Sequence, residues 1–383
     1  MLQLEKPKDV MVGLVSYLPI PSSLGEMKTK PTQYAVRTLN SAGLQPDFII
    51  GRSSAPIDGP RKVKMASHCN VQPEDVISAP DVDSIYDVPM HFEAEGLGKL
   101  VVKKLGLKAG RPDLRKWKAL GDSIKRNKNG LHIGIVSKYT ASGAFALSDA
   151  YLSVAEAIKH ACWSVGRKPK LVWIDAQDLE DHPSHVAKAL KGLHGIVVPG
   201  GFGSRGIEGK ILAIKYAREK KIPFLGLCYG MQLATVEFAR HVLKLKKAHT
   251  TEIDPTTPDP VIHLMNEQEE KMKNKSYGGS MRLGAFACQI KEKTLARALY
   301  GKGEVSERHR HRFEFNSTYR ERFKEAGLIS SGISPDGMLT EIIELKGHPF
   351  FIGSQFHPEY KSRPMKPHPL FMGFAKATMK KSS

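Results

Sequence analysis

An apolar segment that runs into a glycine-flanked cysteine constrains this chain more than any other feature: Ile222-Pro-Phe-Leu-Gly-Leu-Cys-Tyr-Gly-Met-Gln232. Gly226 and Gly230 lie two residues either side of Cys228, and glycine permits the strained backbone of a tight strand-to-helix turn. The pattern predicts a nucleophile elbow, which lifts the cysteine side chain above a sheet and places the Tyr229 amide to donate. The positive end of the following helix favours a thiolate.

A second apolar segment, residues 349–356, ends at His357-Pro-Glu359 and supplies the best-placed base for such a nucleophile. Residues two apart in an extended segment share a face, so Glu359 is expected to reach the far side of the His357 ring and fix its tautomer. The sequence therefore predicts a catalytic triad of Cys228, His357 and Glu359. Either motif alone has a simpler explanation, a buried core cysteine or a turn.

A glycine-rich turn strengthens the catalytic interpretation. Pro199-Gly-Gly-Phe-Gly203 follows an apolar strand expected at 195–198. A backbone amide of this turn, together with the Tyr229 amide, is typical of an oxyanion hole for acyl transfer. The three motifs together therefore favour catalysis over a purely structural role.

The composition excludes several classes of protein. The chain has 383 residues, enough for two domains, and 41% of them are hydrophobic, as in an ordinary globular protein. No apolar run approaches the roughly 18 residues that span a bilayer, and the N-terminus lacks the apolar core of a signal peptide, so we expect a cytoplasmic protein without a membrane partner. The four cysteines are widely spaced and form no CxxC pair, so we expect neither a zinc site nor a disulfide framework, and we assign no metal-binding residue.

The net charge of +19 is concentrated in one segment. Between Lys99 and Lys128 there are eleven lysine or arginine residues and only two acidic ones, Asp113 and Asp122. Such a run could bind nucleic acid or another polyanion, but Trp117 is the one aromatic residue within it. A solvated linker is therefore favoured over a nucleic-acid partner.

Alternating strands and helices predict an α/β protein with two doubly wound parallel-sheet domains. Residues 1–110 form the first domain, 111–130 a basic linker that breaks the periodicity, and 131–383 the second domain. The first domain is expected to contain strands at 10–18, 47–50 and 75–78 and helices at 31–42, 61–67 and 88–105. The second is expected to contain strands at 131–136, 170–174, 195–198 and 223–227 and helices at 149–161, 183–190 and 209–220.

A second anionic site is expected at Lys28-Thr-Lys-Pro-Thr-Gln33. Lysines alternate there with hydroxyl residues at the start of a helix, where ammonium groups, hydroxyls and helix amides favour a phosphate. An exposed lysine-rich helix start explains the same residues. No GxxxxGK[ST] motif occurs in the chain.

Taken together, these segments closely resemble CTP synthase, the glutamine-dependent amidoligase family that aminates UTP with the use of ATP. The resemblance covers nearly the whole chain. It is carried by 28–33, Asp81-Val-Asp-Ser-Ile-Tyr86, 199–203, 226–232, Glu307-Arg-His-Arg-His-Arg-Phe-Glu314 and Gln355-Phe-His-Pro-Glu359.

The resemblance implies a class I glutamine amidotransferase half with Cys228 as nucleophile and His357 and Glu359 completing the triad. It further implies that glutamine is held by Gly201 and by the turn of Tyr229, Gly230, Met231 and Gln232. In addition, Glu252 would bind the ammonium group of glutamine and Arg312 its carboxylate, which suits a bidentate guanidinium.

For the synthase half, the resemblance implies a UTP site that also accepts the product CTP, formed by Lys28, Thr29, Lys30, Pro31, Thr32, Gln33 and Lys64. Asp81 and Val82 resemble part of the ATP site, next to Pro80, a position that can be lysine in relatives. The family forms tetramers and is activated by GTP, so a homo-oligomer and GTP activation are expected.

One departure from the family pattern concerns ATP and Mg²⁺. The family begins with a P-loop and acidic Mg²⁺ ligands that precede the segment corresponding to 28–33, and this chain has neither. The first domain is therefore expected to be the C-terminal part of the synthase domain, with an incomplete sheet. The chain is then a fragment, one half of a split enzyme whose partner is a separate N-terminal polypeptide, or a protein that retains only ammonia release.

Two further functions compete with CTP synthesis. A stand-alone glutaminase or γ-glutamyl hydrolase needs only the elbow and triad, although it has no use for a nucleotide segment at 28–33. A non-catalytic nucleotide-sensing or filament-forming subunit is the other, and an intact triad argues against it.

Overall fold

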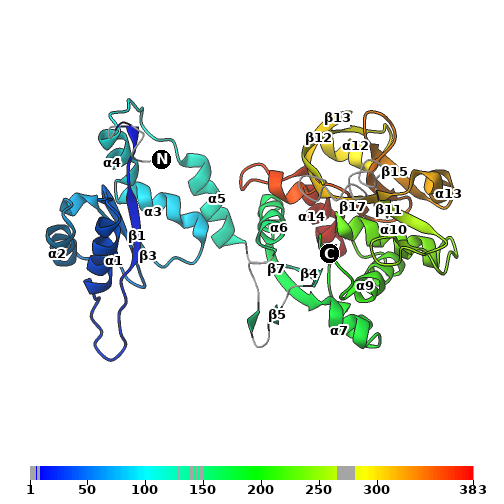
Figure 1. The fold of residues 1–383 in the computed structure, drawn as a ribbon, viewed down its shortest axis with the longest axis horizontal. Helices are drawn as coiled ribbons and strands as arrows, with labels where there is room; N and C mark the ends of the chain where they lie inside the picture. Colours follow the sequence, from blue (N-terminus) through cyan, green and yellow to red (C-terminus); the bar gives the residue numbers. More distant parts are fainter. Residues whose placement is uncertain are drawn as a thin grey trace. The chain divides into compact units, whose positions relative to one another are not determined.

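The computed structural model describes residues 9–127, 129–138, 151–264 and 281–382, together with Lys6 and the backbone of two short strands, β5 (Ala141–Ser142) and β6 (Phe145–Ala146). Contacts between residues divide the chain into two compact units, 1–122 and 123–383 (Figure 1). No helix among the described residues is long and apolar enough to cross a membrane.

The first unit contains the expected parallel βαβ arrangement. Its sheet has the order β1-β2-β3, all parallel, and its core joins Val36 and Met65 of two helices to Ile49 and Val76 of the sheet. Strand β1 carries exposed apolar side chains, since Tyr17 is 60% exposed. The elements are β1 (Gly13–Tyr17), α1 (Lys30–Ser41), β2 (Phe48–Ser53), α2 (Gly59–Cys69), β3 (Val76–Pro80), α3 (Val88–Ala94) and α4 (Leu97–Lys104).

Two expectations for this region need correction. The single helix expected over 88–105 is two helices, because Gly96 between them adopts a left-handed backbone with φ +80°. The segment 111–130, expected to break the periodicity, contains the helix α5 (Arg115–Arg126). Its apolar residues Trp117, Leu120 and Ile124 recur at helical spacing, and the Trp117 ring nitrogen donates to the Tyr86 carbonyl at 2.7 Å.

The second unit is built on a nine-stranded sheet of order β13-β12-β15-β16-β17-β9-β8-β4-β7. From β7 to β17 the neighbouring strands run parallel, and from β17 to β13 they run antiparallel. The strands are β4 (Gly130–Ser137), β7 (Lys168–Asp175), β8 (Gly195–Val198), β9 (Phe224–Leu227), β12 (Arg282–Ile290), β13 (Glu304–His311), β15 (Leu328–Ile333), β16 (Thr340–Leu345) and β17 (Phe351–Ser354).

Helices cover both faces of this sheet, as the doubly wound prediction requires (Figure 1). One face packs on α7 (Ala176–Asp181), α8 (His185–Leu190), α9 (Ile207–Glu219), α10 (Tyr229–His241) and α13 (Arg320–Glu325). The other packs on α6 (Leu152–Ser164), α12 (Leu295–Tyr300) and α14 (Pro369–Ser382). A separate small sheet joins β10 (His249–Thr250), β11 (Pro260–Leu264) and β14 (Phe313–Phe315).

The parallel strands of this unit are confirmed, and the antiparallel ones were not predicted. The helix expected at 149–161 corresponds to α6, which begins at Leu152 and ends at Ser164. The first two residues of the expected range lie outside the described residues. In β13 the buried positions alternate with exposed ones, but three of the four buried side chains are polar: Glu307, His309 and His311. Hydrophobic alternation therefore does not reveal this strand.

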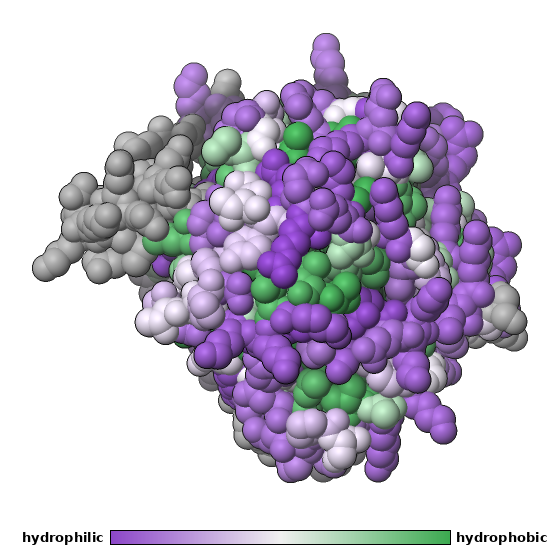
Figure 2. All heavy atoms as spheres, turned by 90° about the vertical axis from the view of Figure 1, so that its right-hand side faces the viewer, coloured by the Kyte–Doolittle hydropathy of each residue, from purple (hydrophilic) through white to green (hydrophobic). Residues whose placement is uncertain are grey.

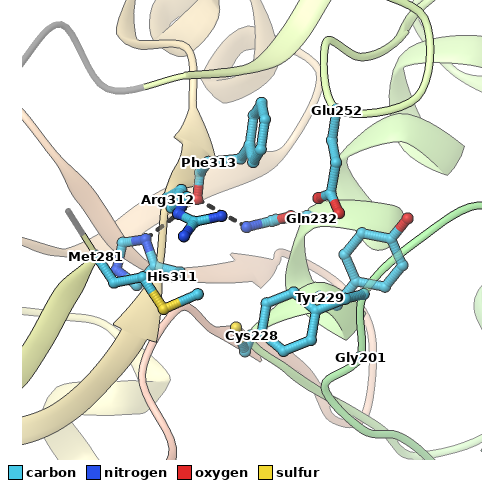
Figure 3. Close-up of a pocket in the computed structure, with 10 residues that line it drawn as sticks. Gly201, Cys228, Tyr229, Gln232, Glu252, Met281, His311, Arg312 and Phe313 are labelled. Atoms are coloured by element: carbon cyan, nitrogen blue, oxygen red, sulfur yellow. Dashed lines mark hydrogen bonds between the residues drawn. The ribbon is translucent and has the colours of Figure 1, made fainter. Parts of the chain in front are cut away.

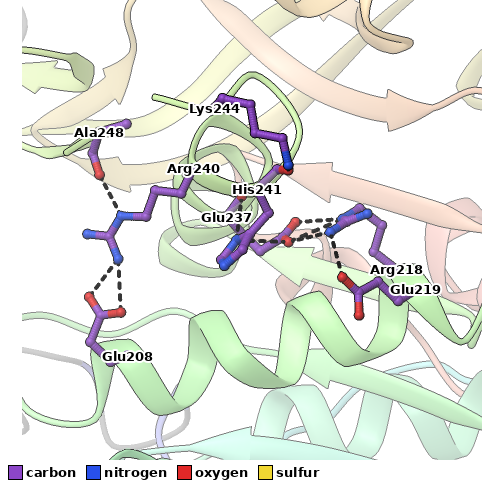
Figure 4. A network of polar contacts seen from close by, with 8 residues as sticks. All are labelled: Glu208, Arg218, Glu219, Glu237, Arg240, His241, Lys244 and Ala248. Atoms are coloured by element: carbon purple, nitrogen blue, oxygen red, sulfur yellow. Dashed lines mark hydrogen bonds and ion pairs between the residues drawn. The ribbon is translucent and has the colours of Figure 1, made fainter. Parts of the chain in front are cut away.

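Ion pairs connect α10 to α9 on one side of the sheet (Figure 4). The fully buried carboxylate of Glu237 accepts from the Arg218 guanidinium at 2.9 Å. Arg240 donates to Glu208 at 2.8 Å and, through Nε, to the Ala248 carbonyl at 2.8 Å. The helix that follows Cys228 is thereby held in one orientation relative to its neighbour. Figure 2 shows one face of the molecule, where small hydrophobic patches lie among mostly hydrophilic side chains.

The elbow between β9 and α10 has the geometry that the sequence predicts. Cys228 has φ +51°, a left-handed conformation that is costly for a residue with a side chain. A Cβ atom added to Gly230 would lie 1.9 Å from the carbonyl oxygen of Val198, and one added to Gly226 would lie 2.8 Å from that of Gly230. Both glycines are therefore required for the close approach of the helix to β8 and β9.

We expect Gly230→Ala to destabilise the second unit by about 3 kcal/mol or more, because the added methyl group meets backbone that cannot rotate away. Thermal unfolding measures the effect. Gly59→Ala is the control, since an added Cβ there meets nothing within 4 Å. Equal melting temperatures for the two variants would contradict the packing argument.

Candidate active site

A cavity of about 50 Å³ lies beside Cys228 at the carboxyl ends of the central parallel strands (Figure 3). In Figure 3, Glu252 and Arg312 approach it from two different segments of the chain. Its lining residues are Gly201, Phe202, Cys228, Tyr229, Gln232, Glu252, Met281, His311, Arg312 and Phe313.

Cys228 is 5% exposed and sits at the N-cap of α10. Its sulfur lies 3.7 Å from the side-chain amide nitrogen of Gln355, which can donate to it, and 3.9 Å from the carbonyl oxygen of Arg310. The positive end of the helix and the Gln355 amide both favour a thiolate at this position. Gln355 belongs to the motif that ends in His357-Pro-Glu359, but no contact with the cysteine was predicted for it from the sequence.

The predicted base and its orienting carboxylate are in contact. Nδ1 of His357 lies 2.7 Å from Oε1 of Glu359. The contact was expected because residues two apart share a face of an extended segment. That reason was wrong, since residues 358–361 form a 3₁₀ turn that begins at Pro358. The turn folds the glutamate back onto the ring, which achieves the same contact.

Charge favours a protonated ring at His357. Burial alone lowers the pKa of the imidazole, but the negative charges of Cys228 and Glu359, and its hydrogen bonds to both, outweigh burial and raise that pKa to about 11. The ring also lies against the glycine turn, since a Cβ added to Gly200 would lie 3.1 Å from Cε1 of His357 and 3.7 Å from Cβ of Cys228. The cysteine, the imidazole and the glycine turn therefore face one another.

Five of the residues predicted to hold glutamine line the cavity: Gly201, Tyr229, Gln232, Glu252 and Arg312. The other two, Gly230 and Met231, do not line it. Met231 is fully buried in the core, and Gly230 packs on β8. Their roles as glutamine-binding residues stay predictions from the family resemblance.

Two polar atoms of this wall are buried without a partner among the described residues. The Gln232 amide nitrogen donates to the Phe313 carbonyl at 2.8 Å and to Oε1 of Gln355 at 3.3 Å, which leaves Oε1 of Gln232 without a donor. Nε of Arg312 likewise has no acceptor. A buried polar group without a partner is costly, so both atoms are available for a ligand.

Two buried lysines donate hydrogen bonds to carbonyl groups of the glycine turn. Neither was predicted from the sequence as a site residue. Nζ of Lys210, in α9, donates to the Pro199 carbonyl at 3.2 Å. Nζ of Lys138 donates to the Phe202 carbonyl at 3.2 Å and to the Gly203 carbonyl, and lies 4.7 Å from the centre of the Tyr229 ring. A trans peptide directs its N–H opposite to its C=O, so these bonds also orient the amides of the turn.

Burial dominates the electrostatics of both lysines. It lowers the pKa of Lys138 to about 8, opposed by the charge of Glu252. For Lys210, burial and the neighbouring charge of Lys138 lower the pKa to about 7, opposed by the charge of Cys228.

The nucleotide segment of the first unit combines exposed lysines with buried polar side chains. Thr32 contacts the Ser16 hydroxyl at 2.9 Å, and the Gln33 amide donates to the Thr29 hydroxyl at 3.3 Å. Lys28 and Lys30 remain at the surface, and Pro31 lies in the first turn of α1. Only the lysines therefore present side-chain donors to solvent.

Two predicted UTP residues, one from the loop before α1 and one from α2, lie near the same carboxylate. Lys28 donates to Glu26 at 2.7 Å. This hydrogen bond and the charge of Lys28, followed by those of Arg61 and Lys64, hold the pKa of Glu26 below its usual value. Lys64, from α2, thus lies in the same positive region as Lys28.

The predicted ATP residues lie at the end of β3. Asp81 is exposed and pairs with Arg52 at 3.1 Å, and Val82 is half-buried. Among the described residues, the one group of three potential metal ligands is Asp178, His182 and His185 in the second unit. It includes no predicted nucleotide-binding residue.

Lys210 has a pKa of about 7 in the folded protein and 10.5 in the unfolded chain, so burying its charged form costs stability below about pH 7. Between these two pH values the unfolded chain holds a proton on Lys210 that the folded chain lacks, so the stability of the wild type rises with pH. We therefore expect Lys210→Met to raise the melting temperature most below about pH 7, and this gain to shrink as the pH rises towards about 10.5. Thermal melts at several pH values measure it. The matched control is Lys220→Met, at the exposed end of α9, and a pH-independent gain would contradict the burial of the amine.

Comparison with known proteins agrees with both units. Residues 1–107 match a family model described as CTP synthase N-terminus, and residues 146–377 match Glutamine amidotransferase class-I. Proteins named CTP synthase from Pyrococcus abyssi and Methanococcus maripaludis are each 50% identical over 378 residues, 98% of this chain. This chain spans about two thirds of their length, 68% and 69% respectively.

A solved structure supports the assignment of the second unit. The Trypanosoma brucei CTPS glutaminase domain with bound acivicin is 34% identical, with a TM-score of 0.60. It covers 65% of this chain, and 94% of its own chain is matched. Both family models match this chain, one after the other, and the relatives named above are 50% identical to it over 98% of its length. This chain therefore belongs to the CTP synthase family of glutamine-dependent ligases.

Proposed function

We propose that this chain hydrolyses glutamine at Cys228 and that the ammonia serves the ATP-dependent amination of UTP to CTP. The observation that carries the proposal is the combination of Glu252 and Arg312 at the cavity beside Cys228. An amino acid presents one ammonium and one carboxylate group, which these two side chains complement. A carboxamide at the end of its side chain is then the group within reach of the sulfur.

Unused polar atoms on the cavity wall support an amino-acid ligand. Nε of Arg312 and Oε1 of Gln232 are buried without partners among the described residues. The first can donate to the carboxylate of glutamine, and the second can accept from one of its N–H groups. Glu252 already accepts from the Gly203 amide at 3.3 Å, which holds its carboxylate in place.

In the proposed first step, the thiolate of Cys228 attacks the carboxamide carbon and the C=O electron pair moves onto oxygen. The amides of Gly201 and Tyr229 stabilise this oxyanion. His357, kept protonated by its neighbours, gives its proton to the nitrogen as the C–N bond breaks. Ammonia leaves, and a thioester joins the glutamyl group to the sulfur.

In the second step, water attacks the thioester and His357 accepts its proton. Glu359 holds the ring by its Nδ1, so Nε2 serves both proton transfers. The C–S bond breaks and glutamate leaves, which restores the thiolate and the protonated imidazole. The cycle consumes glutamine and water and yields glutamate and ammonia.

For the synthase reaction, we propose that Lys28, Lys30 and Lys64 bind the phosphates of UTP, with Asp81 and Val82 near the adenine of ATP. The described side chains around these residues do not fit a Mg²⁺ site, because no group of three potential metal ligands lies in the described part of the first unit, and Asp81 pairs with Arg52 and Glu26 with Lys28. A tetramer and activation by GTP stay predictions from the family resemblance.

We expect Cys228→Ala to abolish glutamate release from glutamine while the protein stays folded, because Cys228 is the one cysteine among the described residues that line the cavity. Cys162→Ala is the control, since burial raises the pKa of that thiol to about 12 and keeps it unreactive. The assay follows glutamate and CTP in one reaction with UTP, ATP, Mg²⁺ and glutamine. Wild-type glutamate release by Cys228→Ala would refute the nucleophile, and glutamate without CTP in the wild type would limit the function to glutaminase.

We expect Lys28→Ala to weaken UTP binding about tenfold, because one charge-assisted hydrogen bond to phosphate is lost. Calorimetric titration with UTP and CTP measures it, and glutamine hydrolysis without nucleotide should not change. Lys99→Ala, an exposed lysine of α4, is the matched control. Equal affinities of the two variants would remove Lys28 from the nucleotide site.

A further inference from the structure

A chain of buried polar side chains begins at His311, which lines the cavity, and continues away from it to His309 and Glu341. Nδ1 of His311 lies 3.1 Å from the Phe313 carbonyl oxygen, and its Nε2 lies 3.0 Å from Nδ1 of His309. Nε2 of His309 lies 3.6 Å from Oε2 of Glu341. The other oxygen of Glu341 accepts from Arg282 at 2.6 Å. Both histidines are 2% exposed and the glutamate is fully buried.

The hydrogen-bond directions follow from the end of the chain at Phe313. A carbonyl oxygen only accepts, so Nδ1 of His311 carries a proton and its Nε2 is the acceptor when the ring is neutral. Nδ1 of His309 must then be the donor, and its Nε2 an acceptor. Burial, and next the charge of Arg282, lower the pKa of His309 to about 2 and that of His311 to about 3, so both rings are neutral.

If Glu341 is ionised, the last two atoms of this series of hydrogen-bonding groups, Nε2 of His309 and Oε2 of Glu341, are both acceptors. Nε2 of His309 and Oε2 of Glu341 are buried, face each other and have no hydrogen-bond partner among the described residues. Such a pair costs the desolvation of two groups and gains nothing. One proton between them satisfies both, after a small side-chain shift that shortens the 3.6 Å separation.

The surroundings of Glu341 are compatible with a neutral acid. Burial raises the pKa of its carboxyl group, the charge and hydrogen bond of Arg282 oppose that shift, and the charge of Asp336 adds to it. A protonated carboxyl still accepts from Arg282 through its carbonyl oxygen. The hydrogen bond from Arg282 to Oε1 of Glu341 can therefore form whether Glu341 is protonated or ionised.

We propose that Glu341 is a positioning residue that holds a proton on Oε2 and donates it to His309, so that the two histidines fix the Phe313 carbonyl behind Gln232. This carbonyl accepts from both His311 and the Gln232 amide, at 3.1 and 2.8 Å. It thereby determines which way the Gln232 amide points and keeps Oε1 of Gln232 towards the ligand. The inference rests on the proposed glutaminase, since Gln232 is assigned there to glutamine.

The substitution Glu341→Gln tests whether Glu341 is protonated, because a glutamine amide, like a protonated carboxyl group and unlike a carboxylate, has both a donor and an acceptor. In Glu341→Gln, the amide N–H can donate to His309 while the amide oxygen still accepts from Arg282. We expect this variant to keep the KM for glutamine within about twofold of the wild type. Glu341→Met has similar length and no donor, and we expect it to raise the KM about tenfold with a smaller change in kcat.

The ring nitrogens of the histidines give a readout that needs no enzyme activity. In ¹⁵N-histidine-labelled protein, Nδ1 of His309 and Nδ1 of His311 are expected to be protonated, and both Nε2 atoms to be hydrogen-bonded acceptors, in the wild type and in Glu341→Gln. In Glu341→Met, the ¹⁵N shift of His309 Nε2 is expected to move to that of an acceptor nitrogen without a hydrogen bond. In His309→Phe, which keeps the Glu341–Arg282 pair, the same change is expected at Nε2 of His311. His309→Phe therefore tests the chain even if Glu341→Met does not fold.

Glu344→Gln is the matched control on the same strand. Glu344 is 6% exposed and accepts from the Leu295 and Ala296 amides at 2.9 and 3.0 Å. Its substitution is expected to lower the melting temperature without changing the KM for glutamine or the ¹⁵N shift of His309 Nε2. The proposal is overturned if Glu341→Gln behaves as Glu341→Met in the KM and in the ¹⁵N shift of His309 Nε2. A wild type that releases no glutamate would instead refute the proposed function, and the ¹⁵N measurement would still decide the role of Glu341.

Discussion

The strained backbone of Cys228, with φ +51°, depends on the close contact of α10 with β8. The helix can begin immediately after β9 only because Gly230 lets its backbone meet the Val198 carbonyl. This contact sets the height of the sulfur above the sheet and the direction of the helix dipole. The cavity, the glycine turn and the histidine all lie around that point, so their geometry depends on it.

The residues around the elbow come from segments far apart in the sequence, and buried polar contacts rather than apolar packing fix them. Lys210 holds the glycine turn, Gln355 approaches the sulfur, and Arg282 and Glu341 lie behind the histidines. Apolar side chains could fill the same volume, but they would not fix the direction of carbonyl groups. The orientation of hydrogen-bonding groups in the cavity wall is therefore determined by polar residues that do not line it.

The sequence predicted those features that depend on local pattern and failed where distant residues pair. The elbow was predictable because glycine spacing and an apolar strand specify it locally. The 3₁₀ turn at Pro358 was not, although the contact of Glu359 with His357 was. The strand β13 escaped prediction because buried histidines and a buried glutamate replace the expected apolar residues. Lys138 and Lys210 were missed because nothing local in a lysine shows that its partner is a carbonyl far along the chain.

The buried lysines also bear on the charge that the proposed reaction develops. Glutamine has no net charge, so its binding leaves the balance of Glu252 and Arg312 undisturbed. In the proposed reaction, negative charge then grows on the carboxamide oxygen beside Gly201, and Lys210 lies near this glycine, since a Cβ built on Gly201 would lie 3.8 Å from Nζ of Lys210. An ammonium near a buried oxyanion stabilises it more than it does in water. Lys210, with a pKa of about 7, supplies that charge only while it is protonated, so the same residue that orients the turn also connects oxyanion stabilisation to pH.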